Sequence, residues 1–561
     1  MKFKKKRLTF KNLSKLDLFL FVIGLAAFFW SIFGQFIWVQ DIGNFLSPDG
    51  YCERCSTYVV FIRVALFFAA TTLIIFRSNV TKILSYFTFN NAISFLNFLI
   101  MAILLFYCAR FFVIGITVLV GYPYPLDFGE GPVLHTAMQF REYGTCYRDI
   151  HEEPYTHCLY PPVFPFLQSL LIQIFGEKLI TGRLISLLSL IAIMYLGYKV
   201  FKIESKDRFL ILLFVVMLPL RATMRWAHIG RIDLLAIAFS VAGIYFYYKN
   251  KNEFKNIYIS MIFFTLAFLT KQTSIIAPAA VFLDLILQRR FKFFLKSLLV
   301  YALHILVSLS VLAVLTNGLF FLHVFSYNSA ISYYLPDALR FMVFFIELVP
   351  ILLLFCLAHA ILSRKISLWL IYLFLAFGGI LTAGRIIASY NHTLEAQVAL
   401  VFCCFFSMEW LIKRYRKHKP AILFIWVGFL IAVLMLVPTF DWSYNEKNSD
   451  ALVQKIASVP GEVIVEDPTY SILANKKVII QDSFFFGQAG ELGLWNSSKL
   501  VSDCENQRFE MIIFSTGNYY GIPGFIECVN TYYKRLPERT GVTYVEDIYV
   551  PRNLSKDAVD N

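Results

Sequence analysis

Charged residues are scarce in this sequence of 561 residues. Asp, Glu, Lys and Arg make up 16% of it and hydrophobic residues 58%, and the mean hydropathy is +0.65. Such a composition excludes an ordinary soluble globular protein and indicates a polytopic membrane protein. The net charge is +14, but the basic residues occur in short clusters between apolar runs. We interpret them as topology signals and expect no nucleic acid partner.

Several signatures of other protein classes are also missing. The basic N-terminal segment is followed by an apolar run that is too long for the core of a cleavable signal peptide and has no clear small-residue cleavage site. This pattern predicts a first membrane anchor. The polar C-terminal part contains no nucleotide-phosphate loop and no catalytic motif that we recognise. The two halves of the chain show no internal repeat, whereas transporters typically have one.

Thirteen apolar segments are candidate membrane spans, although several are shorter than the roughly 20 residues that a perpendicular helix needs. Every second connection between them is rich in Lys and Arg, which the positive-inside rule places in the cytoplasm. We therefore predict a multi-pass protein of the cell (plasma or inner) membrane, with its N-terminus inside and its C-terminus outside. The spans are residues 16–39, 57–76, 94–120, 178–198, 207–223, 231–248, 256–271, 273–288, 297–315, 338–362, 366–383, 393–411 and 420–437.

Polar residues divide the chain further. After the last span, short β-branched runs at 462–466, 477–481 and 510–515 alternate with turn-rich segments, which predicts a small α/β domain outside the membrane. The expected fold is thus an α-helical membrane bundle of about thirteen spans with a C-terminal extracytoplasmic α/β domain. The four regions are N-terminal spans, an extracytoplasmic loop with surface helices, the main bundle and the α/β domain, at residues 1–120, 121–177, 178–437 and 438–561.

The loop 121–177 carries acidic residues in an otherwise apolar neighbourhood. Pro132 suits the first turn of a helix, and apolar residues recur on one helical face up to Tyr143. The pattern predicts a short helix on the membrane surface with the carboxylates of Asp127 and Glu130 at its N-terminus. A solvated loop with ordinary surface acids is the alternative. Residues 161–175 fit either a second surface helix or a re-entrant segment.

Further polar and ionisable residues fall at the outer ends of the predicted spans. Charged groups at a membrane boundary are costly and indicate functional sites, although any single one can be a snorkelling or capping residue. Their gathering on the same side as the acidic loop favours a common site. They are Arg221, Arg225, His228, Arg231, Asp233, Thr270, Lys271, Gln272, Arg385, Asn391, His392 and Glu395.

The ten cysteines separate by predicted compartment. Cys108, Cys356, Cys403 and Cys404 lie in spans, where we expect inert apolar packing. The other six occur two per outside segment and none lies in an inside loop, which predicts disulfides in an oxidising compartment. For Cys52 and Cys55, a redox-active pair and half a zinc site are the alternatives, but no second CxxC supports either. The pairs are Cys52 with Cys55, Cys146 with Cys158, and Cys504 with Cys528.

Outward carboxylates beside outward cations fit two classes of membrane protein. In a transferase with a lipid-phosphate donor, the carboxylate takes a proton from an acceptor hydroxyl and the cations stabilise the departing phosphate. In a transporter or flippase of lipid-linked or small anionic substrates, the charges form a path, typically near the bilayer midplane. Here the charges gather at one surface, which favours the enzyme over the transporter.

Five motifs follow one another between residues 120 and 400 with consistent sidedness. They read DFGEGP at 127–132, YPPVFP at 160–165, GRIDLL at 230–235, LTKQT at 269–273 and YNHTLE at 390–395, with a weaker VEDP at 465–468. Their order resembles the GT-C glycosyltransferases, a polytopic family that includes the protein O-mannosyltransferases and the aminoarabinose transferase of lipid A. The likeness is greatest to the bacterial glycosyltransferase family 39-like group.

The resemblance implies a catalytic base at Asp127, with Glu130 as its partner, and a polyprenyl-phosphate sugar as donor. Arg225, Arg231 and Lys271 are then candidates for binding the donor phosphate. In some similar enzymes the acidic pair helps to hold a divalent metal ion. Two residues separate the acids here, unlike an adjacent or DxD pair, so the sequence leaves open whether a divalent metal ion is bound. Three spans precede the acidic loop, where many relatives have one.

We therefore expect an inverting glycosyltransferase of the outer membrane face, with a lipid, glycan or protein acceptor that the sequence does not distinguish. Asp127 deprotonates the acceptor, and its oxygen attacks the anomeric carbon in line with the lipid phosphate. Glu130, His392 and Glu395 orient sugar or acceptor, and a loop carrying Arg148, His151 and Glu152 closes over the substrates. The full predicted substrate-binding set is Arg148, His151, Glu152, Tyr160, Arg225, Arg231, Asp233, Lys271, Gln272, His392 and Glu395.

Overall fold

A computed structural model describes residues 89–219, 222–250, 253–329, 331–386, 388–436, 446–514, 521–542 and 545–552. The first two predicted spans, and Cys52 and Cys55, lie outside the described residues. The chain forms two compact units. Of the described residues, one unit contains 89–103 together with Val349–His359 and 407–436, and the other contains the remainder. Every site residue discussed below belongs to the second unit.

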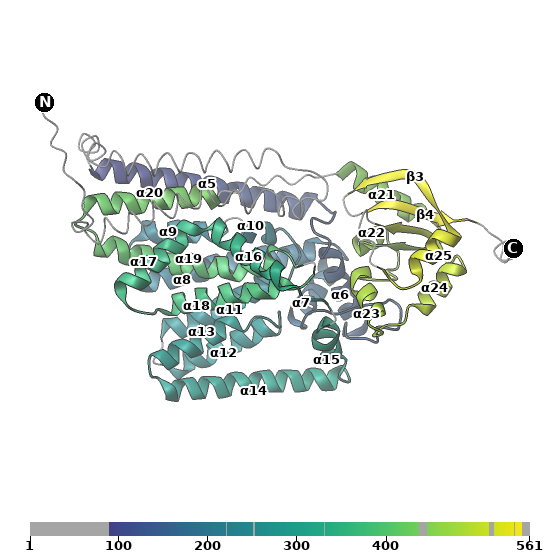
Figure 1. The fold of residues 1–561 in the computed structure, drawn as a ribbon, viewed down its shortest axis with the longest axis horizontal. Coiled ribbons are helices and arrows are strands. Elements are labelled where there is room, and N and C mark those ends of the chain that lie inside the picture. Colours follow the sequence, from purple (N-terminus) through teal and green to yellow (C-terminus); the bar gives the residue numbers. More distant parts are fainter. Residues whose placement is uncertain are drawn as a thin grey trace, which may run out of the picture. The chain divides into compact units, whose positions relative to one another are not determined.

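Helices occupy each of the eleven predicted spans that the structure describes (Figure 1). Most begin and end within a few residues of the predicted limits, because runs of apolar residues specify helices in a membrane protein. Their bounds are α5 Phe89–Gly121, α8 Ile180–Glu204, α9 Arg208–Met217, α11 Asp233–Lys249, α12 Phe254–Phe268, α13 Ile276–Leu287, α14 Phe291–Leu315, α16 Leu335–Leu348, α17 Pro350–Ser363, α18 Leu368–Gly379, α19 Leu394–Arg414 and α20 Lys419–Leu436.

Length separates these helices into two groups. Within the described part of the chain, five helical segments are long and apolar enough to cross a membrane, or six if α16 and α17 form one broken span. The break at Val349 precedes Pro350, which has no amide hydrogen and cannot continue a helix, but which suits the first turn of a new one. Others, such as α9, α12 and α13, have 10–17 residues. The structure is thus a multi-pass helical protein in which several predicted spans are short.

Helix α11 lies at the centre of the second unit, where it packs against α8, α12 and α13 (Figure 1). Its residues are buried on nearly every side, as expected for a helix that is apolar all round. Small residues along it allow close approach of neighbouring helices, and Ser260 of α12 donates a hydrogen bond to the Gly243 carbonyl at 2.7 Å. This packing fixes the N-terminal end of α11, which begins at Asp233.

The predicted helix of the acidic loop is present as α6, Glu130–Tyr143, and a second helix, α7, covers Val163–Phe175. The sequence predicts one apolar face for α6, but the helix is buried on most sides. Leu134 and Ala137 pack with Ile172 of α7 and with two residues of the C-terminal part of the chain, Ile472 and Val478. The local sequence did not reveal this second covering layer.

The C-terminal region, residues 446–552, contains a four-stranded sheet in the order β1-β2-β4-β3, in which β1 and β2 are parallel and the other pairs antiparallel. Two of the three predicted β-runs are strands, whereas 477–481 makes only an isolated bridge. The elements are α21 Glu446–Ser458, β1 Glu462–Val465, α22 Pro468–Leu473, α23 Ser483–Glu491, α24 Ser498–Glu505, β2 Phe509–Phe514, α25 Phe525–Tyr532, β3 Tyr533–Val542 and β4 Val545–Pro551.

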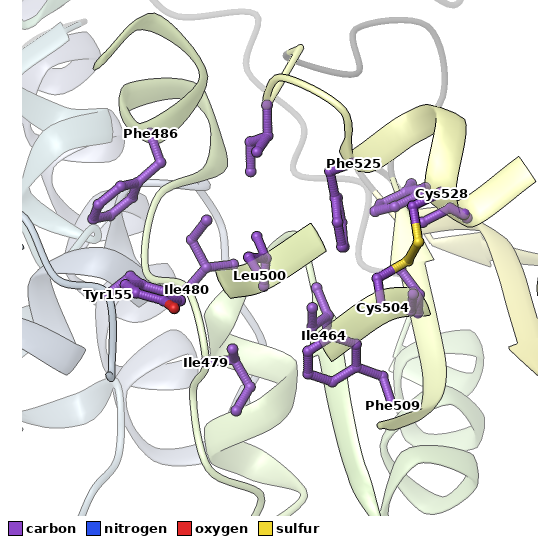
Figure 2. Packing of buried hydrophobic residues seen from close by; sticks show 14 of the residues in the cluster. Tyr155, Ile464, Ile479, Ile480, Phe486, Leu500, Cys504, Phe509, Phe525 and Cys528 are labelled. Atoms are coloured by element: carbon purple, nitrogen blue, oxygen red, sulfur yellow. A yellow bond between two sulfur atoms is a disulfide. The ribbon is translucent and has the colours of Figure 1, made fainter. Parts of the chain in front are cut away.

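A hydrophobic core joins this sheet to the acidic loop. Tyr155 of the loop is buried among Ile480, Phe486 and other apolar residues of the C-terminal region (Figure 2). Disulfides join Cys146 to Cys158 within the loop and Cys504 to Cys528 within the C-terminal region. These two of the three predicted pairs are therefore confirmed. The four cysteines expected in apolar packing are buried.

Candidate active site

Asp127 and Arg231 form an ion pair at the start of α6. The Arg231 Nη1 atom donates to Asp127 Oδ1 at 2.9 Å, and the same oxygen accepts the Gly129 amide at 3.0 Å. The two side chains are 22% and 18% exposed, so both remain accessible. Among the described residues, no hydrogen bond reaches Asp127 Oδ2. One carboxylate oxygen is therefore held in place and the other is open to a ligand.

Gly129 makes this pair possible. A Cβ atom at position 129 would lie 1.5 Å from Arg231 Nη1. The residue has ordinary helical dihedral angles, with φ −68°, so the need for glycine comes from the close approach of the guanidinium and not from the backbone conformation.

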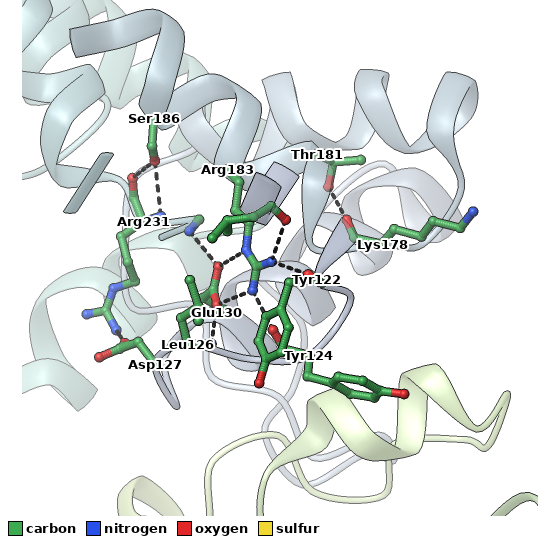
Figure 3. Close-up of polar contacts among 12 residues, drawn as sticks. Tyr122, Tyr124, Leu126, Asp127, Glu130, Lys178, Thr181, Arg183, Ser186 and Arg231 are labelled. Carbon is green, nitrogen blue, oxygen red and sulfur yellow. Dashed lines mark hydrogen bonds and ion pairs between the residues drawn. The ribbon is translucent and has the colours of Figure 1, made fainter. Parts of the chain in front are cut away.

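Glu130 is turned into the protein and pairs with Arg183 of α8 (Figure 3). Arg183 donates to both oxygens, from Nε to Oε1 at 2.8 Å and from Nη2 to Oε2 at 2.9 Å. The amides of Gly230 and Leu126 donate to the same carboxylate at 2.8 Å each. The side chains of Glu130 and Arg183 are 0% and 1% exposed. This carboxylate is fully occupied, and it connects the Asp127 loop to the segment that carries Arg231.

Arg183 completes the network by holding the backbone ahead of Asp127. Its guanidinium also donates to the carbonyls of Tyr122 and Tyr124, both at 2.6 Å (Figure 3). Bidentate pairing of this kind fixes geometry as well as charge. The sequence reasoning missed Arg183, although a single arginine near the start of an otherwise apolar span is a signal that could have found it.

A second ion pair lies at the start of α11. Lys271 Nζ donates to Asp233 Oδ1 at 2.7 Å, and Asn391 Nδ2 donates to the same oxygen at 3.1 Å. Asp233 is 1% exposed and Lys271 15%. The Oδ2 atom of Asp233 is buried without a hydrogen-bond partner in the described structure. The side chain is thus held at one oxygen, as Asp127 is.

The two pairs form one electrostatic cluster. Arg231 interacts with Asp127, Asp233 and the Tyr160 hydroxyl, and Lys271 interacts with Asp233 and Glu395. The charges alternate in sign from Asp127 through Arg231 and Asp233 to Lys271. The structure therefore brings together residues from all five sequence motifs, which are far apart along the chain.

The remaining residues of the fourth and fifth motifs make local contacts. Gln272 Nε2 donates to the Leu159 carbonyl at 3.2 Å. His392 Nδ1 bonds to the Thr382 hydroxyl at 2.7 Å, and Glu395 accepts from the Tyr372 hydroxyl at 3.2 Å. The Oε1 atom of Gln272 and the Nε atom of Arg231 are buried without a partner among the described residues. Such atoms are ready to bind a polar ligand.

Three predicted residues of the acidic loop have contacts outside this cluster. Arg148 bonds Gln139 at 3.1 Å and pairs with Glu152 at 3.6 Å. His151 bonds its neighbour Asp149, and its side chain is half exposed. The described structure gives none of the three a contact with Asp127 or Arg231. Arg225 lies over the Trp226 ring on helix α10, Ala222–Ala227, which packs against the motif that contains His392.

The C-terminal region adds two carboxyl groups that sequence reasoning did not assign to the site. Burial raises the pKa of Asp467 to about 7, against the hydrogen bond from the Thr469 amide and with support from the charges of Glu130 and Asp127. Burial also raises the pKa of Asp482, and the charge of Arg231 opposes that rise. Both groups therefore lie close enough to the loop cluster to interact with it electrostatically. The weak VEDP similarity was the only sequence signal for Asp467.

The donor set does not fit a divalent metal ion. Carboxylates that bind such ions are normally gathered with several oxygens around one point. Here Asp127 is paired with a guanidinium, Glu130 with another, and Asp233 with an ammonium group. No group of three or more His, Cys, Asp or Glu residues suited to a metal was found in the described chain.

Comparison with known proteins identifies the fold. Residues 160–316 match a protein-family model described as dolichyl-phosphate-mannose-protein mannosyltransferase. The solved structure of apo ArnT from Cupriavidus metallidurans has a TM-score of 0.53 at 9% identity, covering 79% of this chain and 97% of ArnT. ArnT bound to undecaprenyl phosphate gives 0.55 at 10% identity, covering 80% and 98%. No curated protein matches the chain. The chain has the fold of the GT-C superfamily, as its motifs predicted.

Proposed function

We propose that this multi-pass membrane protein of the GT-C fold is a glycosyltransferase. It moves a sugar from a polyprenyl-phosphate donor to a hydroxyl of a lipid, glycan or protein acceptor at the extracytoplasmic face. The observation that carries the proposal is the cluster of alternating charges at the ends of apolar helices, from Asp127 through Arg231 and Asp233 to Lys271. The ArnT structure with undecaprenyl phosphate supports the class of donor.

The donor phosphate binds between Arg231 and Lys271. Arg231 has an unpartnered Nε donor, and Lys271 uses one of its three ammonium donors on Asp233. Cations in a partly buried site stabilise a phosphate more strongly than in water, and charge-assisted bonds of this kind are the strong ones. The same groups stabilise the negative charge that develops on the phosphate as it leaves.

Asp127 acts as the general base. Its Oδ1 atom is held by Arg231 and the Gly129 amide, so Oδ2 can accept the proton of the acceptor hydroxyl. The acceptor oxygen then forms a bond to the anomeric carbon while the bond from that carbon to the phosphate oxygen breaks. The electron pair of the broken bond goes to the phosphate, and attack opposite the leaving group inverts the configuration.

Glu130 is a positioning residue in this proposal. Both of its oxygens accept hydrogen bonds from Arg183 and from backbone amides, so it does not contact the substrate. It fixes the position of Asp127 relative to the segment that contains Gly230. Asp233, His392 and Glu395 orient the sugar or the acceptor. Preorganised groups of this kind contribute by restricting the reactants to a productive geometry.

Transfer of a labelled sugar from a polyprenyl-phosphate donor in detergent tests the proposal. Detergent removes compartments and gradients, so only an enzyme gives product there. We expect transfer by the wild type when donors and acceptors are varied. If no donor and acceptor combination gives product, while the protein moves a lipid-linked or small anionic solute across liposomes, the proposal fails and the protein is a transporter.

A further inference from the structure

Gln481 of the C-terminal region connects three parts of the second unit through one side chain. Its Nε2 atom donates to the Pro132 carbonyl and to the Thr136 hydroxyl, both at 2.7 Å. Its Oε1 atom accepts the His157 amide at 2.8 Å. The residue is 1% exposed. Both amide hydrogens and the carbonyl oxygen are therefore used, and all of the partners belong to the acidic loop and its helix α6.

Backbone pairing holds Gln481 beside the loop. Tyr155 forms an isolated parallel bridge with Ile480. The Tyr155 amide donates to the Ile479 carbonyl at 2.8 Å, and the Gln481 amide donates to the Tyr155 carbonyl at 3.0 Å. The loop thus adds one short extended segment beside 479–481. This pairing brings the Gln481 side chain to the first turns of α6.

An ion-pair cluster reinforces the same contact. Arg508 donates to both oxygens of Glu153, at 2.7 and 2.9 Å, and Lys477 approaches Glu153 at 3.2 Å. The hydrogen bonds from Arg508 lower the pKa of Glu153 to about 2. Glu153 is therefore ionised at neutral pH, and it binds the loop to the C-terminal region two residues before Tyr155.

The packing against α6 is close on a second side. A Cβ atom at Gly131 would lie 2.3 Å from the Thr469 hydroxyl and 2.9 Å from the Thr469 amide nitrogen. The start of α6 thus contacts the start of α22 directly. Gly131 and Pro132 come immediately after Glu130, so the C-terminal region contacts the helix turn that follows Asp127.

We infer that Gln481 is a positioning residue, through which the C-terminal region sets the position of α6 and hence of Asp127. The inference rests on the proposed function for its catalytic consequence. Asp127 and the first turn of α6 are joined by the hydrogen bond from the Glu130 amide to the Asp127 carbonyl at 3.0 Å. A shift of α6 therefore moves the base, whereas Arg231 and Lys271 do not contact Gln481 in the described chain and remain in place to bind the donor.

The test compares Gln481→Glu with Gln481→Leu. The glutamate side chain keeps the shape of glutamine and an oxygen that accepts the His157 amide. Its second oxygen replaces the Nε2 donor, so the bonds donated to the Pro132 carbonyl and the Thr136 hydroxyl are lost. The leucine variant keeps the burial and loses all three bonds. Gln454→Glu is the matched control, because Gln454 is an exposed residue of α21 in the same region. Amide hydrogen exchange and sugar transfer are measured on the full chain in detergent.

We expect faster exchange across 130–143 in both Gln481 variants, with the strands β1 and β2 protected as in the wild type. With saturating donor, kcat should fall about 10- to 100-fold, as for other small misplacements of catalytic groups, while KM for the donor stays unchanged. A merely destabilising substitution would instead expose the sheet. Gln454→Glu should alter none of these quantities.

Unchanged amide exchange across 130–143 in the Gln481 variants would overturn the inference. If the wild type transfers sugar, faster exchange in a variant whose kcat equals that of the wild type would overturn it as well. If the wild type transfers no sugar, the proposed function fails separately. In that case the exchange data alone decide whether Gln481 holds α6, with faster exchange supporting this connection and unchanged exchange refuting it.

Discussion

Glu130 and Arg183, which are 53 residues apart in the sequence, neutralise each other in the interior through two hydrogen bonds of 2.8 and 2.9 Å. A buried ion pair contributes little relative to apolar residues of the same size, but removing one partner leaves an uncompensated buried charge. The pair therefore maintains the geometry of the loop that carries Asp127.

Replacement of Arg183 tests this role. Arg183→Met should lower the stability of the folded protein by about 3–5 kcal/mol, because the Glu130 carboxylate loses its counter-charge in a buried position. Thermal unfolding in detergent measures the change. Arg141→Met is the matched control, since Arg141 forms an exposed pair with Glu177 that is worth about 0–1 kcal/mol. Equal unfolding temperatures for the two variants would contradict the role given to Arg183.

Gly129→Ala should separate stability from activity. The new methyl group would occupy the position of Arg231 Nη1, and a flexible guanidinium can move aside at little cost to the fold. We expect near-normal thermal unfolding and sugar transfer lowered by about 10- to 100-fold, because the Asp127–Arg231 pair is displaced. Gly121→Ala is the control, with no atom within 4 Å of its added Cβ. Wild-type transfer by Gly129→Ala would show that the pair is not needed.

Asp467 should make stability depend on pH near neutrality. Burial raises its pKa from 3.8 in an exposed state to about 7. The folded form therefore favours the protonated carboxyl. The contribution of this group to the free energy of unfolding is complete below about pH 4 and is lost as the pH rises through about 7. Asp467→Asn should unfold at a temperature higher than the wild type by several degrees at pH 8, with the difference shrinking towards pH 5. A difference that is independent of pH would contradict the shifted pKa.

Membrane topology gives an independent prediction. The positive-inside pattern places Lys417 in the cytoplasm and the chain after Val437 outside. A reporter active only outside the membrane should therefore be active when fused after Val437 and inactive when fused at Lys417. Identical signals from both fusions would contradict the face assigned to the site.

The sequence was most informative where the chemistry is local. Apolar runs specified the positions of the membrane helices. The even number of cysteines in each segment predicted to lie outside the membrane predicted the Cys146–Cys158 and Cys504–Cys528 disulfides that the structure contains. Polar residues at helix ends marked Asp127, Arg231, Asp233 and Lys271. Their proximity in the fold could be predicted, because charged groups in an apolar environment normally pair with one another.

Contacts between distant segments were not foreseeable in the same way. The periodicity of α6 indicates one apolar face, but it does not reveal that Ile472 and Val478 cover another. The partner of Glu130 could not be chosen from the sequence, because the contact with Arg183 depends on how α8 packs. The sequence predicts Gln481 to be part of a β-strand, but it does not predict that its side chain donates hydrogen bonds to residues of α6. These features follow from tertiary packing and not from local pattern.

The central claim is that Asp127 is the base and Arg231 binds the donor phosphate. The most direct measurement is transfer of sugar from a labelled polyprenyl-phosphate donor in detergent, with donor binding measured in parallel, for Asp127→Asn and Arg231→Ala. Asp127→Asn should bind the donor like the wild type and transfer sugar about 10²–10⁴-fold more slowly. Arg231→Ala should lose about 1.5–3 kcal/mol of donor-binding free energy. Wild-type transfer by Asp127→Asn, or unaltered donor binding by Arg231→Ala, would contradict the account.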